Sequence, residues 1–263
     1  MNRVAVARIG PALFLAVAIL AVWQVGVTVS GMPQFILPSP LAIIGVIAGS
    51  ASLLLRNLVA TLEEFGFGLG ASILCGVVLG VATAKSRTFA ETMYPLLIAT
   101  QSVPKLALAP LFTVWFGFGL LPKVLIAFLI AFFPITVNTA AGLMSTDPDT
   151  LLMARSMGLS AAQRFLKVEV PSALPAVFAG LKVGTAFAVV GAVVGEFLGA
   201  DAGLGRVTLT ASTTLDTPLL FAALTVLAAV GLASYGLVAT LEWLLIPWNA
   251  EADETATFRA SGL

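Results

Sequence analysis

The sequence contains no histidine and only one cysteine in 263 residues. Without histidine there is no imidazole for a nucleophile pair, a proton relay or a histidine-based metal site. The single cysteine, Cys75, excludes an intrachain disulfide, and its place in an apolar run predicts a packed side chain. No catalytic site, metal site or cofactor is therefore expected.

Charge is also scarce, since only 10% of the residues are charged whereas 59% are hydrophobic, and the mean hydropathy is +1.07. A soluble domain carries about 25% charged residues. A soluble chain this apolar would lack the polar surface that keeps it dispersed, so lipid is the expected solvent. The net charge of zero gives no basic surface for nucleic acid. The chain is therefore expected to be an all-α, polytopic membrane protein.

Long apolar runs are abundant. A hydrocarbon core about 30 Å thick requires about 20 apolar residues in a helix. Reading between charges predicts six transmembrane helices, at about 11–30, 62–84, 91–118, 121–143, 175–198 and 218–246. The first is expected to be a retained anchor, because it is of full length and lacks the small-residue cleavage site of a signal peptide.

The boundaries of these spans carry the polar features. Glu63 and Glu64 are expected at the start of the second span, and Pro104 with Lys105 interrupts the third. Between the first two spans, an apolar stretch from about Leu41 to Leu55 predicts a short interfacial helix, with a re-entrant segment as the alternative. We expect one transmembrane domain over 1–263, with its core at about 57–246.

Basic residues predict the orientation, because lysine and arginine accumulate on the cytoplasmic side. With both termini cytoplasmic, the inner segments hold most of them: Arg3, Arg8, Lys85, Arg87, Arg155, Arg164, Lys167 and Arg259. The outer loops then hold only Arg56 and Arg206, and three lysines lie within spans or at their ends.

The longest cytoplasmic loop, about 144–174, is predicted to be a helix–glycine–helix elbow. Asp147 and Pro148 are typical of a helix start, and Gly158 is suited to the left-handed residue that ends a helix. Ser160 and Gln163 form a capping box for a second helix. Pro171 and Pro175 are expected to end that helix and restart the chain into the fifth span.

The elbow carries an apolar set that a solvated connector does not need, namely Leu152, Met153, Phe165 and Leu166. An apolar centre with a polar rim is how a docking interface is built. The alternative is that these side chains fold back on the inner face of the bundle.

The elbow resembles the cytoplasmic loop of ABC importer permeases, whose pattern is E-A-A-x3-G-x9-I-x-L-P. Ala154, Gly158, Val168, Val170 and Pro171 stand at those spacings, whereas the glutamate and first alanine of the pattern are Leu152 and Met153 here. Further stretches are similar to the branch that imports sulfonates, taurine, nitrate and thiamine-pyrimidine precursors. They are 102–111, 115–119, 132–139, 195–197 and 203–205.

The resemblance implies a type I ABC importer permease fold in the inner membrane and a substrate that is a small anion or a heterocycle. It implies as partners two cytoplasmic ATPase subunits, a second and identical permease copy, a periplasmic or lipid-anchored binding protein, and membrane lipid. The elbow would be the ATPase-coupling loop, through Leu152, Met153, Ala154, Arg155, Gly158, Phe165, Val168 and Pro171.

Polar residues in the third and fifth spans are candidates for the substrate pathway: Gln101, Ser102, Lys105 and Glu196. An ionisable residue inside a span is a functional hypothesis by default, and a lysine facing the pathway would suit an anion. The alternative is that Lys105 snorkels or pairs with a carboxylate such as Glu196.

Two other classes remain as alternatives, a self-sufficient secondary transporter and a membrane-embedded enzyme. The absence of an internal repeat disfavours the first, and the scarcity of catalytic groups disfavours the second. The phosphate-binding pattern G-x-x-x-x-G-K-[ST] is absent, and Lys85-Ser86 lies at the end of a span instead of after a strand. ATP hydrolysis is therefore expected on another chain.

Overall fold

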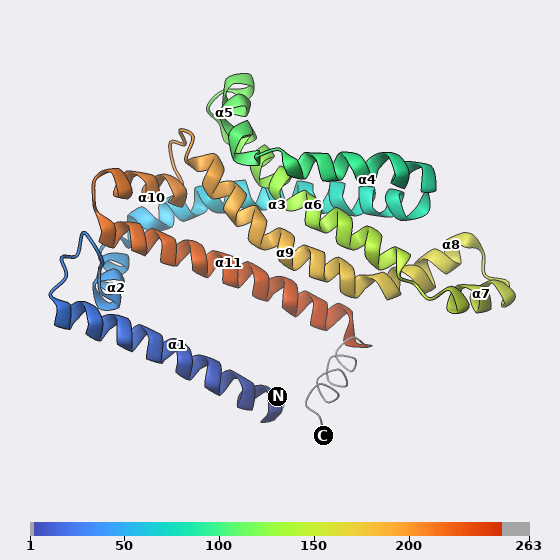
Figure 1. Ribbon diagram of the computed structural model, residues 1–263, viewed down its shortest axis with the longest axis horizontal. Coiled ribbons are helices and arrows are strands. Elements are labelled where there is room, and N and C mark those ends of the chain that lie inside the picture. The colour runs from blue at the N-terminus through green and yellow to red at the C-terminus, as the bar shows by residue number, and fades with distance from the viewer. Residues whose placement is uncertain (1–2, 249–263) are drawn as a thin grey trace. The chain divides into compact units, whose positions relative to one another are not determined.

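A computed structural model of the chain describes residues 3–248, which form helices without any strand (Figure 1). The helices are α1 Arg3–Ser30, α2 Pro40–Gly49, α3 Ala51–Lys85, α4 Arg87–Ser102, α5 Lys105–Phe116, α6 Leu120–Met144, α7 Pro148–Ser156, α8 Ala161–Arg164, α9 Val170–Glu196, α10 Leu204–Thr213 and α11 Thr217–Leu245. One turn of π-helix, Phe165–Glu169, joins α8 to α9.

The predicted spans are confirmed as helices. Five helices of the described chain are long and apolar enough to cross a membrane, and the bent pair α4 and α5 makes a sixth if it counts as one span. The two members of this pair meet at 91° at the interruption predicted at Pro104. The helix α10 was not predicted, because its short sequence contains several threonines and lacks a long apolar run.

The boundary between α2 and α3 corrects two predictions. The interfacial helix expected over about 41–55 ends at Gly49, and the second span begins at Ala51, well before Glu63 and Glu64. Charged side chains mark where an apolar run ends, but they do not end a helix. The helix is interrupted at Gly49 and Ser50. No glycine or proline follows in α3 before Gly66, so α3 continues past both glutamates.

The elbow's second helix corrects another prediction, because Pro171 and Pro175 do not end it. Residues 161–196 form one continuous helical stretch that contains the π-turn. A proline ring clashes with the carbonyl four residues earlier in a regular helix. In the wider turn Val170 N donates to Phe165 O, five residues back, which gives Pro171 room. The elbow is thus continuous with the span α9.

The chain divides into two compact units, of which residues up to 60 together with 201–227 form the first. In that unit Gln24 Oε1 accepts a hydrogen bond from Leu41 N, and the Trp23 and Phe221 rings lie 5.8 Å apart. The buried Asn57 Oδ1 accepts a hydrogen bond of 2.8 Å from Gly203 N. This contact fixes the loop before α10 to the start of α3.

The second unit, 61–200 together with the residues from 228 onward, contains the elbow and the helices that continue into it. Here α6 and α9 run side by side along their lengths (Figure 1). Small residues allow this approach: a Cβ added to Gly191 would lie 2.5 Å from Cα of Ala127, and one on Gly142 would lie 2.7 Å from Cβ of Ala176. Van der Waals packing at such contacts is a main source of helix association in lipid.

The helix α3 packs on α6 in the same way. A Cβ on Gly68 would lie 2.5 Å from Cβ of Ala127, and one on Gly80 would lie 2.6 Å from Cβ of Thr139. Ser72 adds a hydrogen bond of 3.1 Å to Phe128 O. Helix α6 therefore packs between α3 and α9.

These contacts predict the effect of single methyl groups. Gly191→Ala should lower the free energy of unfolding by on the order of 1–3 kcal/mol, because the new methyl overlaps the backbone of α6. Gly66→Ala is the matched control, since a Cβ at Gly66 meets nothing within 4 Å. Thermal unfolding of the purified protein in detergent should separate the two variants, and equal melting temperatures would contradict the proposed packing.

Candidate functional site

The elbow begins at a fully formed helix cap. The Asp147 carboxylate accepts hydrogen bonds from Thr150 Oγ1 at 2.7 Å and from the backbone N–H groups of Asp149 and Thr150 at 3.2 Å each. These bonds favour the ionised form and hold the pKa of Asp147 below its ordinary value. The cap is therefore complete above the ordinary pKa of an aspartate and weakens as the pH falls through the lowered value.

The turn between α7 and α8 depends on Gly158, as predicted. Its φ is +78°, and Leu159 N donates to Ala154 O while Gly158 N donates to Arg155 O, at 3.2 Å and 2.9 Å. This is the Schellman arrangement, which needs a left-handed residue after the helix. The predicted capping box follows, with Ser160 Oγ accepting from Gln163 N and Gln163 Oε1 accepting from Ser160 N.

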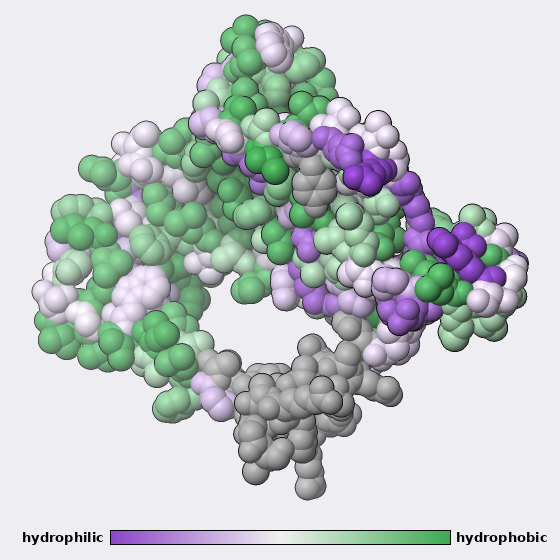
Figure 2. Space-filling model, turned by 45° about the vertical axis from the view of Figure 1, so that its right-hand side comes forward, coloured by the Kyte–Doolittle hydropathy of each residue, from purple (hydrophilic) through white to green (hydrophobic). Residues whose placement is uncertain are grey.

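Three of the four apolar side chains of the elbow are exposed, so these three do not fold back on the bundle. The exposed fractions of Leu152, Met153 and Leu166 are 57%, 59% and 65%. Phe165, Val168 and Pro171 are half-buried, and Ala154 is buried. Figure 2 shows a mainly hydrophobic surface on which hydrophilic side chains gather at the right, the side on which Figure 1 places the elbow.

An ion pair missed by the sequence analysis attaches the elbow to the end of α3. The Lys85 ammonium bonds to the Glu169 carboxylate in the π-turn and lies 4.7 Å from the centre of the Phe165 ring. The end of α3 therefore meets the π-turn that joins α8 to α9. No periodic pattern relates residues that are so far apart in the chain, so only the folded structure pairs Lys85 with Glu169.

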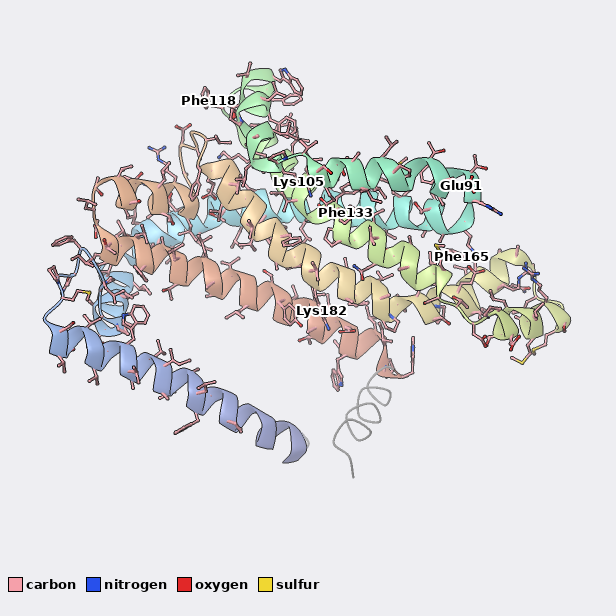
Figure 3. The ribbon with its side chains drawn as sticks, in the orientation of Figure 1. Glu91, Lys105, Phe118, Phe133, Phe165 and Lys182 are labelled. Atoms are coloured by element: carbon pink, nitrogen blue, oxygen red, sulfur yellow. The ribbon has the colours of Figure 1, made fainter. Side chains whose placement is uncertain are left out.

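The interruption between α4 and α5 places three of the predicted pathway residues together. Gln101 and Ser102 are the last two residues of α4, and Lys105 is the first residue of α5. Lys105 is partly exposed. The Lys105 ammonium bonds to Gln101 Oε1 and lies 6.0 Å from the centre of the Phe133 ring (Figure 3). The structure thus pairs Lys105 with Gln101 and Phe133, not with the suggested carboxylate.

An aromatic cluster stands on α5 beyond this lysine. The ring centres of Phe112 and Trp115 are 6.1 Å apart, and Trp115 lies edge-on to Phe116 at 6.4 Å. Trp115 and Phe116 are exposed. Flat, exposed rings offer stacking surfaces, and these rings lie at the end of α5 opposite to Lys105.

Glu196, the fourth predicted pathway residue, lies in a buried polar cluster of α3, α6 and α9. Its Oε1 accepts a hydrogen bond of 2.5 Å from Thr61 Oγ1. The neighbouring Glu64 accepts a hydrogen bond of 2.6 Å from the Lys123 ammonium. From the sequence, Glu64 was expected at the start of the second span, and Lys123 was counted only among the lysines within spans or at their ends. Two adjacent glutamates next to an apolar run were the available indication that one of them points inward.

A second intramembrane ion pair joins α9 to α11. The Lys182 ammonium bonds to the Glu242 carboxylate and lies 5.8 Å from the centre of the Tyr235 ring. Figure 3 shows Lys182 on α9, in the middle part of that helix. Burying an unpaired lysine in a membrane span costs free energy. The ion pair with Glu242 offsets this cost for Lys182.

Together, these features define a polytopic membrane subunit with an exposed helix–glycine–helix elbow that is continuous with one of its spans. The family described as "Binding-protein-dependent transport system inner membrane component" matches residues 72–244. The chain belongs to this family.

Relatives of known role agree with the assignment. A riboflavin transport system permease protein of Chloroflexus aurantiacus is 42% identical over 245 residues, which cover 91% of each chain. A formylaminopyrimidine transport permease protein of Halalkalibacterium halodurans is 38% identical over 240 residues, covering 91% of this chain and 95% of the relative. The taurine transport system permease protein of Escherichia coli is 32% identical over 241 residues, covering 89% and 87%.

Solved structures show the same fold. An inward-facing structure of the MetNI methionine ABC transporter has a chain that matches with a TM-score of 0.61 at 19% identity, covering 73% of this chain and 97% of that one. An amino acid ABC transporter gives the same TM-score at 18% identity, with coverages of 74% and 95%.

The chain is therefore the inner-membrane permease subunit of an ABC importer, with the type I permease fold. Members of this class work with separate ATPase subunits and a substrate-binding partner, so ATP hydrolysis lies on other chains. This family assignment replaces the secondary-transporter and enzyme alternatives.

Proposed function

We propose that the elbow is the surface through which ATP hydrolysis drives this permease, by docking into a cytoplasmic ATPase subunit. The observation that carries the proposal is the exposed apolar set of Leu152, Met153 and Leu166 on a capped, continuous helical support. Leu152 and Met153 replace the acidic and first small residue of the family pattern, so the contact here is apolar at its centre. Arg155 and Lys167 supply the polar rim.

The orientation follows from the same proposal. The elbow lies on the cytoplasmic side, and so do both termini, as the distribution of lysine and arginine favours. A second, identical copy completes the pathway within the lipid bilayer, and a periplasmic or lipid-anchored binding protein delivers the substrate. The whole chain, 1–263, acts as one transmembrane permease domain.

The pathway is proposed to pass the break between α4 and α5, near Gln101, Ser102 and Lys105, because exposed polar side chains at a broken helix need a polar surrounding in a membrane. Glu196 is proposed to contribute from its buried position, by holding the end of α9. The substrate is a small anion or a heterocycle. The higher identities to the riboflavin and formylaminopyrimidine permeases, 42% and 38%, favour a planar heterocycle, which the exposed rings of α5 would stack against.

The direct test is reconstitution of this chain in lipid with its ATPase and binding protein. Substrate-stimulated ATP hydrolysis is expected with a pyrimidine or flavin, and weaker stimulation with taurine or nitrate. Absence of any stimulation by the binding protein in an assembled complex would contradict the proposal.

Gly158 provides a sharp test of the elbow. Gly158→Val should abolish both co-purification of the ATPase and substrate uptake, because a Cβ disfavours the left-handed backbone by roughly 1–2 kcal/mol and the helix α7 would be turned away. The transmembrane spans lie outside this turn, so membrane expression should persist.

The matched control is Gly158→Asn. No atom lies within 4 Å of a Cβ at this position, so only the backbone conformation penalises a side chain, and asparagine tolerates that conformation. Uptake should therefore survive in the asparagine variant. Equal activity of the valine and asparagine variants would show that the turn is not part of the coupling.

Lys105 tests the pathway. Lys105→Ala should reduce uptake at least several-fold with little change in the amount of folded protein, because the ammonium contacts only Gln101 and the Phe133 ring among the described residues. The contrasting variant is Lys123→Ala, which should lower the yield of folded protein because it leaves the buried Glu64 and Glu196 without their cation. Normal uptake by Lys105→Ala would remove this lysine from the pathway.

A further inference from the structure

The buried polar cluster of Thr61, Glu64, Lys123 and Glu196 contains a carboxylate oxygen that has no hydrogen-bond donor in the described part of the chain. Two ionised carboxylates cannot supply one, because they only accept hydrogen bonds. Glu64 and Glu196 are 2% and 1% exposed. One oxygen of Glu64, Oε1, accepts the hydrogen bond from Lys123. The other, Oε2, is buried and has no donor among the described residues. A buried oxygen without a partner is costly, and each such group calls for an explanation.

A second carboxyl group, that of Glu196, lies beside Glu64. Glu196 accepts its hydrogen bond from Thr61, which stands one turn before Glu64 on the same face of α3. The neighbouring Gly195 packs against Lys123, the partner of Glu64. An ionised carboxylate only accepts hydrogen bonds, so two ionised groups side by side would repel one another in a surrounding of low dielectric constant. Carboxyl groups that share a site in this way hold one proton between them. A proton on Glu64 turns its unpartnered oxygen into a donor.

We propose that Glu64 and Glu196 form a buried proton-binding site, in which the protonated Glu64 donates a hydrogen bond to the ionised Glu196. Glu196 then accepts a bond from Glu64 in addition to the one from Thr61 Oγ1. The Lys123 ammonium donates to the remaining oxygen of Glu64 and offsets the single negative charge of the pair. The charged groups in contact come from all three helices, with Glu64 on α3, Lys123 on α6 and Glu196 on α9.

Helix packing builds this site. A Cβ on Gly195 would lie 2.9 Å from Cα of Lys123, so the glycine before Glu196 lets α9 approach α6 closely. Glu63, the residue before Glu64, is exposed and stays outside the cluster. Two adjacent glutamates on one helix thus have opposite environments, which supplies a control within the chain.

The site lies at the ends of α6 and α9 that are remote from the elbow. The helical stretch from Lys123 to Met144 is about 31 Å long at about 1.5 Å per residue, close to the thickness of the hydrocarbon core. A proton held there is sealed while α3 and α9 stay together. If these ends part, both carboxyl groups meet water and ionise at neutral pH, so separation of the helices would release the proton.

Infrared spectroscopy of the purified full-length protein in lipid, with isotope-labelled glutamate, detects the carbonyl stretch of a protonated carboxyl group. At neutral pH the wild type should show one protonated glutamate per chain. The band should be lost in Glu64→Gln, which keeps an amide donor facing Glu196, and it should be unchanged in Glu63→Gln. Loss is also expected in Glu196→Gln, which gives a second reading if one variant folds poorly.

Three outcomes would overturn the proposal. They are a wild-type spectrum without a protonated glutamate at neutral pH, a band that survives in both Glu64→Gln and Glu196→Gln, and a band that disappears in Glu63→Gln. The measurement needs neither substrate nor ATPase, so its result is independent of the proposed coupling and substrate.

Discussion

The close contact between α6 and α9 is the interaction on which the rest of the second unit depends. In lipid, burial of apolar surface does not drive helices together, so association relies on tight van der Waals packing and interhelical hydrogen bonds. Glycines on both helices remove the side chains that would keep the backbones apart, as at Gly142 and Gly191. The contact runs between the elbow at one end and the polar cluster at the other.

This arrangement explains how the short elbow can act on distant parts of the subunit. The elbow's second helix continues through a π-turn into α9 without a break, and Lys85 ties the same turn to α3. A displacement of α7 is therefore transmitted to α9 through continuous helical backbone and to α3 through the ion pair of Lys85 with Glu169. Because close-packed helices do not deform continuously, such a displacement moves them together.

Charged residues inside the spans show a common solution to burial in lipid. Lys123 pairs with Glu64, and Lys182 pairs with Glu242, so these charges have partners on other helices. Lys105 differs, since its partner Gln101 is neutral and lies one turn away on the neighbouring helix. This difference is the reason why Lys105, and neither Lys123 nor Lys182, is proposed for the substrate pathway.

Local patterns predicted much of the fold. The spans and the elbow's caps depend on neighbours in sequence, so the apolar runs, Asp147, Gly158 and the capping box of Ser160 all led to correct elements. The start of α3 and the continuity through Pro171 were wrong, because both depend on backbone geometry that residue type alone does not fix.

The candidate site divides in the same way. The exposed apolar surface of the elbow was recognisable from sequence, as was the break beside Lys105. The pairing of Glu64 with Lys123 and of Lys85 with Glu169 was not, because tertiary packing brings together residues far apart in the chain. A single sequence carries no record of such pairs, whereas the folded helices place them within bonding distance.

The central claim is that the elbow faces the cytoplasm, where an ATPase can reach it. Single cysteines at Arg164 and at Asp201, introduced after removal of Cys75, test it through labelling of intact cells or spheroplasts with a membrane-impermeant thiol reagent. The account predicts that the cysteine at Asp201 is labelled from outside and that the one at Arg164 reacts only after the membrane is opened. Labelling at Arg164 in sealed cells would contradict the account.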